Sequence, residues 1–247
     1  MNRISKRVEA RYRVMRYYQR IIGAAKARGY TVENLGEVDG DPILFLGPPQ
    51  AGEIRVLVAA GFHGDEPAGP LAVLSALETL PDFLLNAAQV SFLPLVNPSG
   101  FRWNTRLDSS GLDMNRGFCH PEKGYKLAPE GRVLVEHLNR LKEAGRDLLL
   151  TLHEDVDEHR FYLYIYESKD RPGPLGQAIF DEGLKHFELA RGAGEFRDHD
   201  SSFDDLLFHE GVPHVICMET PCLEPIEDRI SCHVAMIRTA IEFLTKV

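Results

Sequence analysis

The sequence has little of what marks secreted, membrane-spanning or redox proteins. It contains four cysteines in 247 residues and no pair spaced CxxC, so it indicates neither a disulfide framework nor a redox motif. No apolar run approaches the roughly 18 residues that a membrane span needs. The basic start, MNRISKRVEARYRVMRYYQR, lacks the unbroken apolar core of a signal peptide. We therefore expect reduced thiols, no membrane partner and a cytoplasmic location.

Positive charge is also scarce. Lysine and arginine number 28 against 37 aspartates and glutamates, giving a net charge of −9. Binding to a phosphate backbone needs clustered Lys and Arg, so we expect no nucleic-acid partner. The glycines of GFHGDEPAG, residues 61–69, have neither the GxGxxG nor the GxxxxGK[ST] spacing of a phosphate cradle, which argues against nucleotide binding.

Apolar β-rich segments alternate with segments of helical periodicity along most of the chain. The expected strands are Thr31–Glu37, Ile43–Leu46, Ile54–Ala60, Gln89–Leu95, Asp147–His153, Phe161–Glu167 and His214–Glu219. The expected helices are Val8–Arg28, Pro67–Leu80, Glu130–Ala144, Leu175–His186 and Asp228–Lys246. This alternation, with several strands apolar on both faces, predicts an α/β fold in which helices cover both faces of the sheet.

The chain shows no linker, repeat or low-complexity tract that would divide it. We predict one domain over residues 1–247, in which residues 1–50 supply an N-terminal helix and a hairpin with a DGD turn. The longest irregular stretch is 97–128, and loops of that length in compact domains are usually functional.

Polar residues follow the expected strands at the points where ligands bind in open α/β sheets. His63 and Glu66 follow one strand, Asn97 follows the next, and His153 and Glu219 end two others. The carboxyl ends of parallel strands meet at one edge of a sheet, so these side chains are expected to converge.

His63 and Glu66 stand three positions apart across a strand-to-helix turn, with Gly61 and Gly64 beside them. This spacing lets an imidazole and a carboxylate reach one metal ion, and His153 would complete a set of two histidines and one glutamate with an open position, as in catalytic zinc sites. Glu219 would then serve as the general base. The alternatives are a solvated turn, a surface histidine and a structural glutamate.

The loop NPSGFRWNTRLDSSGLDMNRGF offers groups for gripping a substrate. Arg116 beside Asn115 suits a carboxylate, and Arg106 could stabilise an oxyanion. Asp113 could accept the second N–H of a liganding histidine. Each arginine could equally form an ordinary salt bridge.

In order, HxxE, NPxGF, an Arg, GxDxNR, a later His and a later Glu resemble the zinc carboxypeptidases of the M14 family, together with the related murein peptide amidases and aspartoacylase/succinylglutamate desuccinylases. The resemblance covers roughly Arg55 to Pro221. It implies a doubly wound mixed β-sheet and one zinc ion. It also implies roles for eight residues: zinc ligands His63, Glu66 and His153; oxyanion donor Arg106; carboxylate anchors Asn115 and Arg116; Asp113 orienting His63; and Glu219 as general base and acid.

Two departures from the family pattern affect the expected substrate. Digestive carboxypeptidases carry a loop tyrosine before the catalytic Glu, but RGAGEFRDHDSSFDDLLF has none, which leaves His199 or one of the tyrosines in FYLYIY as replacements. The acidic run EDVDEH after His153 could be a solvated loop or a wall that receives a substrate ammonium.

We predict a zinc metallopeptidase of the carboxypeptidase or peptide amidase type, acting on an amide bond in a small substrate with a free carboxylate. A short peptide, such as a cell-wall peptide whose D-centre carries an ammonium and a carboxylate, is the favoured substrate. The alternatives are an N-acyl-amino-acid deacylase of the aspartoacylase/succinylglutamate desuccinylase type and a non-catalytic zinc- or carboxylate-binding protein. The sequence leaves the oligomeric state open.

Overall fold

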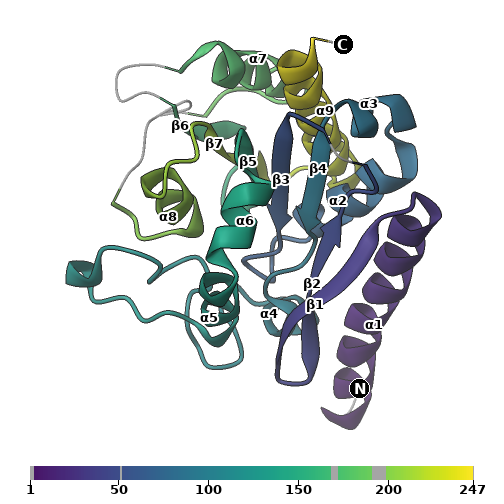
Figure 1. Ribbon diagram of the computed structural model, residues 1–247. Coiled ribbons are helices and arrows are strands. Elements are labelled where there is room, and N and C mark those ends of the chain that lie inside the picture. Colours follow the sequence, from purple (N-terminus) through teal and green to yellow (C-terminus); the bar gives the residue numbers. More distant parts are fainter. Residues whose placement is uncertain (1–2, 51, 168–171, 191–198, 247) are drawn as a thin grey trace.

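A computed structural model of the protein describes residues 3–50, 52–167, 172–190 and 199–246, with side chains from residue 13 onward. Across these ranges, seven strands form one sheet in the order β1-β2-β4-β3-β5-β7-β6 (Figure 1). The strands are β1 (Thr31–Val38), β2 (Asp41–Gly47), β3 (Arg55–Ala60), β4 (Gln89–Leu93), β5 (Leu148–Asp155), β6 (Tyr162–Tyr166) and β7 (Val215–Pro221). All seven predicted strands are present, with ends shifted by one or two residues.

The four central strands β4, β3, β5 and β7 are parallel, and antiparallel strands flank them on both sides. β5 is buried along nearly its whole length, as its apolar sequence LLLTL predicts. The predicted mixed sheet is therefore confirmed. The carboxyl ends of β3, β5 and β7 lie side by side, which places the polar residues that follow them at one edge.

Helices form one layer on each face of the sheet (Figure 1). The core on one face is covered by α1 (Arg3–Ala27), α2 (Ala68–Thr79), α3 (Asp82–Ala87), α7 (Pro174–Gly183) and α9 (Ile226–Thr245). The core on the other face is covered by α5 (Pro129–Glu136), α6 (Leu138–Ala144) and α8 (Phe203–His209). Two short elements, α4 (Pro98–Trp103) and η1 (Pro121–Lys123), lie in the connection between β4 and α5.

The N-terminal segment packs onto this sheet. β1 and β2 form a hairpin whose two-residue turn, Asp39–Gly40, has both residues at positive φ (54° and 77°), as a tight I′-type connection requires. β2 joins the sheet by pairing with β4. From α1, the Tyr17 hydroxyl hydrogen-bonds the carbonyl oxygens of Pro70 and Pro94, both at 2.9 Å.

Sequence periodicity joined two helices into one and missed three short ones. The single helix expected over Glu130–Ala144 is broken at His137, whose ring Nε2 lies 2.8 Å from the carbonyl oxygen of Leu35 on β1. This tertiary contact holds the residue at which α5 ends and α6 begins. The short helices α3, α4 and α8 were not expected, because six or seven residues are too few to show a 3.6-residue period.

Two further features of the described residues concern membrane-spanning helices and cysteines. None of their helices combines the length and the apolar character needed to cross a bilayer. All four cysteines are free thiols.

Candidate active site

A pocket of about 380 Å³ opens where β3, β5 and β7 end. Seven of the eight residues singled out from the sequence line it: His63, Glu66, Arg106, Asn115, Arg116, His153 and Glu219. The eighth, Asp113, contacts His63 from behind. The structure therefore brings together side chains that are up to 156 positions apart (219 − 63).

Two glycines shape the turn that carries His63 and Glu66. Gly61 has φ +72°, a conformation that side chains disfavour. Gly64 lies against α4 so closely that a Cβ there would be 1.8 Å from the carbonyl carbon of Gly100. Its amide also donates to the Thr105 oxygen at 3.0 Å. The turn thus needs glycine for backbone conformation at one position and for close approach at the other.

Both imidazoles face one carboxylate. His63 Nδ1 lies 2.6 Å from Glu66 Oε1, and His153 Nδ1 lies 2.9 Å from Glu66 Oε2. The two rings are 5.0 Å apart between centroids. All three residues are at most 3% exposed, and their possible ligand atoms lie within 4.8 Å of one another.

The outer nitrogen of each imidazole has a polar neighbour. His63 Nε2 is 3.1 Å from Asp113 Oδ1, as expected for an orienting carboxylate. His153 Nε2 is 3.3 Å from Asn115 Nδ2, an amide donor that can bond this nitrogen only when the nitrogen carries no proton. Phe62 stacks on His153 with ring centroids 5.3 Å apart. A carboxylate next to the nitrogen that does not bind the metal, as found at His63, is the usual support of a metal-binding histidine. The buried, convergent set of two nitrogens and a carboxylate therefore fits a divalent metal such as Zn²⁺.

The charges in this cluster favour a cation. Burial alone would lower the pKa of His63, but Glu66 and Asp113 outweigh it and raise that pKa to about 9. Burial alone would raise the pKa of Glu66, yet the two adjacent imidazoles hold it well below its usual range. The cluster thus stabilises positive charge next to an ionised carboxylate.

Glu219 lies beside this cluster on β7. It pairs in register with His153 on β5 and with Tyr162 on β6, so backbone hydrogen bonds on both sides fix its position. Burial raises the pKa of Glu219 to about 7; His153 opposes this increase and Glu66 adds to it. A carboxylate with a pKa near neutrality can both accept and return a proton near pH 7.

The two arginines differ in their contacts. Arg106 is 42% exposed, and its guanidinium lies 3.3 Å from Glu66 Oε1 and 3.3 Å from Asp113 Oδ2. Arg116 donates to the Asn115 carbonyl oxygen at 2.7 Å and lies 3.6 Å from Asp200 Oδ2. Arg106 therefore extends over the metal-ligand cluster, while Arg116 lies at a separate wall of the pocket.

Asn115 has more contacts than the sequence suggested. Its Oδ1 accepts the Phe203 backbone N–H at 2.9 Å, and its Nδ2 lies 3.3 Å from His153 and 3.4 Å from Asp204 Oδ2. The residue is only 4% exposed. Its amide therefore packs against His153 and links it to α8, and it also lines the pocket.

Asn97 follows a strand as expected but does not reach this pocket. Its Oδ1 accepts the Gly100 N–H at 2.7 Å and caps α4, and its Nδ2 donates to the Phe62 carbonyl at 3.1 Å. The side chain is fully buried. Asn97 therefore holds the turn in place from below, and three strand ends converge in the pocket rather than four.

The sequence placed Glu154 only within the acidic run after His153, and it did not single out Asp204. Glu154 accepts the Ala68 N–H at 2.6 Å, where α2 begins, and is paired with Arg229. Asp204 accepts from Thr151 and Asn115. Both are at most 2% exposed, but only the packing of α8 and α9 brings their partners to them, so no local sequence pattern indicated these contacts.

The acidic run after His153 lines the pocket, as do the tyrosines of β6. Glu154, Asp155 and Asp157 are part of the pocket wall. Tyr162, Tyr164 and Tyr166 share the face of β6 that borders the pocket, and the Tyr162 hydroxyl donates to Asp155 Oδ2 at 2.7 Å. Of the suggested replacements for the loop tyrosine, these three therefore lie in the pocket, whereas His199 is not among the residues that line it.

The fold and this site place the chain among the carboxypeptidase-like metallohydrolases. Residues 53–189 match the sequence profile described as the succinylglutamate desuccinylase/aspartoacylase catalytic domain. Because the match covers more than half of the chain, the chain belongs to this family. The resemblance to the wider group of zinc carboxypeptidases, predicted from the motifs, is confirmed.

Individual relatives agree with this membership. A Shewanella amazonensis protein assigned as a metallopeptidase superposes with a TM-score of 0.87 at 33% identity, over 94% of this chain and 93% of that one. Murein peptide amidase A of Escherichia coli K12 is 34% identical over 111 residues, which are 45% of this chain and 42% of the relative. The crystal structure of the murein-tripeptide amidase MpaA from Escherichia coli O157 is similar in fold, with a TM-score of 0.64 at 18% identity over 91% of this chain and 95% of that one.

Proposed function

We propose that this chain is a zinc-dependent hydrolase that cleaves an amide bond in a small peptide carrying a free carboxylate. The observation that carries the proposal is the approach of two buried Nδ1 atoms, from His63 and His153, to the two oxygens of Glu66. The relatives named as metallopeptidases and as a peptide amidase support it. We further propose that the protein acts in the cytoplasm.

In this proposal His63, Glu66 and His153 hold one Zn²⁺. The ion would supply Lewis acidity toward the scissile carbonyl and would lower the pKa of water at the site. Asp113 keeps His63 oriented, and the stacked ring of Phe62 packs against His153. These contacts fix both imidazoles before substrate arrives.

Glu219 moves the proton. Its pKa near 7 allows the carboxylate to take a proton from the attacking water and to deliver it to the leaving amine nitrogen. No lysine or arginine among the described residues forms a salt bridge with Glu219, and the charges that most oppose its raised pKa are those of His153 and His63. Its position on a central strand keeps it near the bond that breaks.

The arginines bind the anionic parts of the substrate. Arg116 would exchange its 3.6 Å contact with Asp200 for two parallel hydrogen bonds to the substrate carboxylate, with Asn115 beside it. Arg106, already directed over Glu66, would donate to the carbonyl oxygen as negative charge develops there.

The charge of the pocket favours a substrate that also carries an ammonium group. Seven carboxylate side chains line the pocket, against two arginines. Asp155 and Asp157 lie on the wall that follows His153. A peptide whose reacting centre bears both an ammonium and a carboxylate complements this arrangement, whereas N-acetyl-aspartate and N-succinyl-glutamate carry several negative charges and no ammonium.

The second candidate is an N-acyl-amino-acid deacylase, because the matching profile is that of desuccinylases and aspartoacylases. One assay separates the two. Zinc-loaded protein is incubated with a panel of short peptides, including γ-linked ones with a free amine at the carboxyl-terminal residue, and with the two N-acyl amino acids. We expect turnover of the peptides and at least about 100-fold lower kcat/KM for the N-acyl amino acids. The opposite order would favour the deacylase.

A non-catalytic binding protein makes a third prediction in the same assay. Such a protein would bind zinc but hydrolyse no member of the panel. The wild-type activity is compared with that of Glu219→Gln, which removes the proposed base but keeps the zinc ligands. Equal rates for the two proteins would show that any activity comes from another site or a contaminant.

A further inference from the structure

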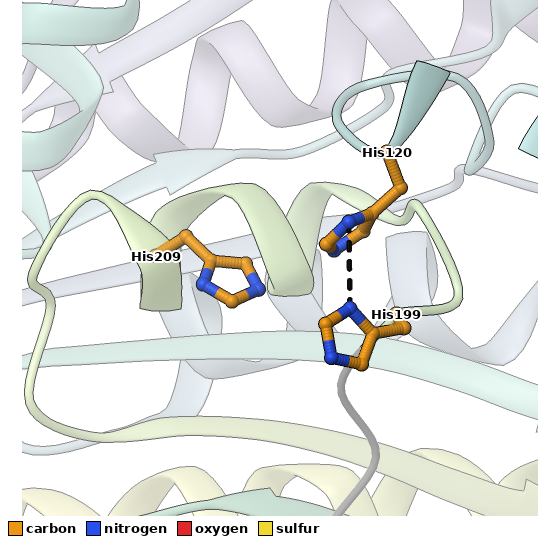
Figure 2. Close-up of side chains that lie close together, drawn as sticks. All are labelled: His120, His199 and His209. Atoms are coloured by element: carbon orange, nitrogen blue, oxygen red, sulfur yellow. Dashed lines mark hydrogen bonds between the residues drawn. The ribbon is translucent and has the colours of Figure 1, made fainter. Parts of the chain in front are cut away.

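Three histidines from different parts of the chain meet beside α8 (Figure 2). His120 precedes η1, His199 precedes α8, and His209 is the last residue of α8. One ring nitrogen from each can be chosen so that all three lie within 4.8 Å of one another. None of the three belongs to the pocket lining described above, so they form a separate cluster.

The closest pair has the spacing expected of two ligands to one ion. His120 Nδ1 and His199 Nδ1 are 3.4 Å apart. Two nitrogens bound tetrahedrally at about 2.05 Å from one zinc ion would be about 3.4 Å apart. His209 completes the group, with its ring centroid 5.1 Å from that of His120 and 6.0 Å from that of His199.

A buried carboxylate supports the cluster from behind. Asp205 is fully buried, and its Oδ2 accepts the Ser201 N–H at 3.0 Å and lies 3.3 Å from His120 Nε2, close to that nitrogen but not hydrogen-bonded to it. Its Oδ1 lies 3.6 Å from His209 Nε2 and has no hydrogen-bond partner among the described residues. A carboxylate on the outer nitrogen of a histidine is the usual support of a metal ligand, because it fixes the ring and directs the other nitrogen to the ion.

The backbone also directs these rings inward. His120 and His199 both have positive φ, 55° and 68°, which non-glycine residues seldom adopt. A surface histidine held only by an acidic neighbour is the simpler alternative, since Glu122 Oε1 also lies 3.4 Å from His120 Nδ1. The Glu122 contact accounts for the position of His120 alone. It does not explain why three histidine rings converge, or why Asp205 lies behind two of them.

We propose that His120, His199 and His209 form a second site for a divalent transition metal, with Asp205 orienting His120. An all-imidazole donor set suits Zn²⁺, Ni²⁺ or Cu²⁺, whereas Mg²⁺ and Ca²⁺ need oxygen ligands. The site is built from residues that take no part in the proposed catalysis.

The second site lies where it can brace the substrate pocket. Arg116 is four residues before His120, and its ion-pair partner Asp200 directly follows His199. Between them, Phe118 N donates to Ser201 O at 3.1 Å. A metal bound by His120 and His199 would therefore join the two segments that carry the Arg116–Asp200 pair.

Zinc binding to a variant without the first site tests this proposal independently of catalysis. The double variant His63→Ala/His153→Ala of the full chain is dialysed against buffered Zn²⁺, and metal is counted by mass spectrometry. We expect one Zn²⁺ per chain with micromolar or tighter affinity. Adding His209→Ala should raise the Kd at least about 100-fold, since loss of a mere supporting residue already costs 10- to 100-fold. Asp205→Asn should weaken binding within that smaller range.

The matched control is His186→Ala, which removes a histidine near Glu182 that is outside the cluster. It should leave binding unchanged. His209 is 40% exposed, so its replacement should not disturb folding. If the double variant does not fold, as judged by circular dichroism, the same count is made in the wild-type chain, where two Zn²⁺ should fall to one with His209→Ala. No Zn²⁺ beyond the first site, or binding that survives both His209→Ala and His120→Ala, would overturn the proposal.

Discussion

His153 and Glu219 are direct neighbours across the parallel strands β5 and β7. Paired residues of neighbouring strands point to the same face of the sheet, and both side chains reach the same pocket. His153 also lies 2.9 Å from Glu66. The pairing of β5 with β7, rather than a loop, therefore fixes the position of Glu219, the proposed general base, relative to His153, a proposed metal ligand.

Replacing Glu219 by Gln should abolish turnover while leaving the zinc content at one ion per chain in the His63 site. The amide keeps the shape of the side chain but cannot accept the proton, so kcat should fall by about 10²- to 10⁴-fold. Steady-state kinetics and metal analysis on the same sample check this. Glu210→Gln, which changes an exposed glutamate paired with Lys142, is the control and should keep full activity. Full activity in Glu219→Gln would remove it as the base.

Replacing Arg116 by Ala should mainly weaken substrate binding. The guanidinium is proposed to anchor a carboxylate remote from the scissile bond, so its loss should raise KM by about 10- to 100-fold, as expected for a charged hydrogen bond of about 1.5–3 kcal/mol. With an amidated substrate that lacks the carboxylate, most of the difference in KM between the wild type and Arg116→Ala should disappear. Arg160→Ala, an exposed arginine outside the pocket, is the control. An equal loss for both substrates would contradict the anchoring role.

Removing the metal should cost both activity and stability. The buried His63, Glu66 and His153 would lose their common partner, and a ligand present at about a thousand times its Kd contributes about 4 kcal/mol of stability. For a chain of this size that corresponds to a fall in Tm of about 10 °C. Calorimetry before and after treatment with a chelator measures it. Re-added Zn²⁺ should restore both properties and Mg²⁺ should not; undiminished activity in metal-free protein would contradict the proposed mechanism.

Glu130 makes the folded state sensitive to pH at a place away from the active site. Burial raises its pKa to about 7, with a contribution from Asp108, and its Oε2 has no hydrogen-bond partner among the described residues. A carboxyl whose folded pKa is raised favours folding most fully below its ordinary pKa, which for Glu130 is 4.5. The contribution is then lost as pH rises from there through about 7.

Glu130→Gln should therefore become more stable relative to the wild type as pH rises from 5 to 8, by on the order of 2–3 kcal/mol. Urea denaturation at several pH values measures the difference. Glu136→Gln, an exposed change on the same helix, should show no such trend. A difference between Glu130→Gln and wild type that is the same at pH 5 and pH 8 would show that this carboxyl does not titrate on folding.

The sequence predicted the sheet and the core of the site for physical reasons that can be stated. The strands are long apolar runs, and the expected ligands His63, Glu66 and His153 stand at strand ends, so their convergence follows from the rule for parallel sheets. Gly64 marked the sharp turn, although its close contact with the Gly100 backbone was not predictable.

What the sequence could not give depends on tertiary packing. His137 splits a periodic segment because it contacts β1, and Asp204 reaches Thr151 and Asn115 only through the docking of α8. Likewise, His120 and His209 are 89 positions apart (209 − 120), and no local pattern suggests that they meet.

The central claim is that His63, Glu66 and His153 hold one zinc ion. Anomalous diffraction at the zinc edge, from crystals of protein purified without chelators, tests it most directly. The account predicts a peak about 2.0–2.1 Å from Nδ1 of both histidines and about 2.0–2.2 Å from a Glu66 oxygen. If crystals of active protein that contains zinc show no peak between these three side chains, the claim is contradicted.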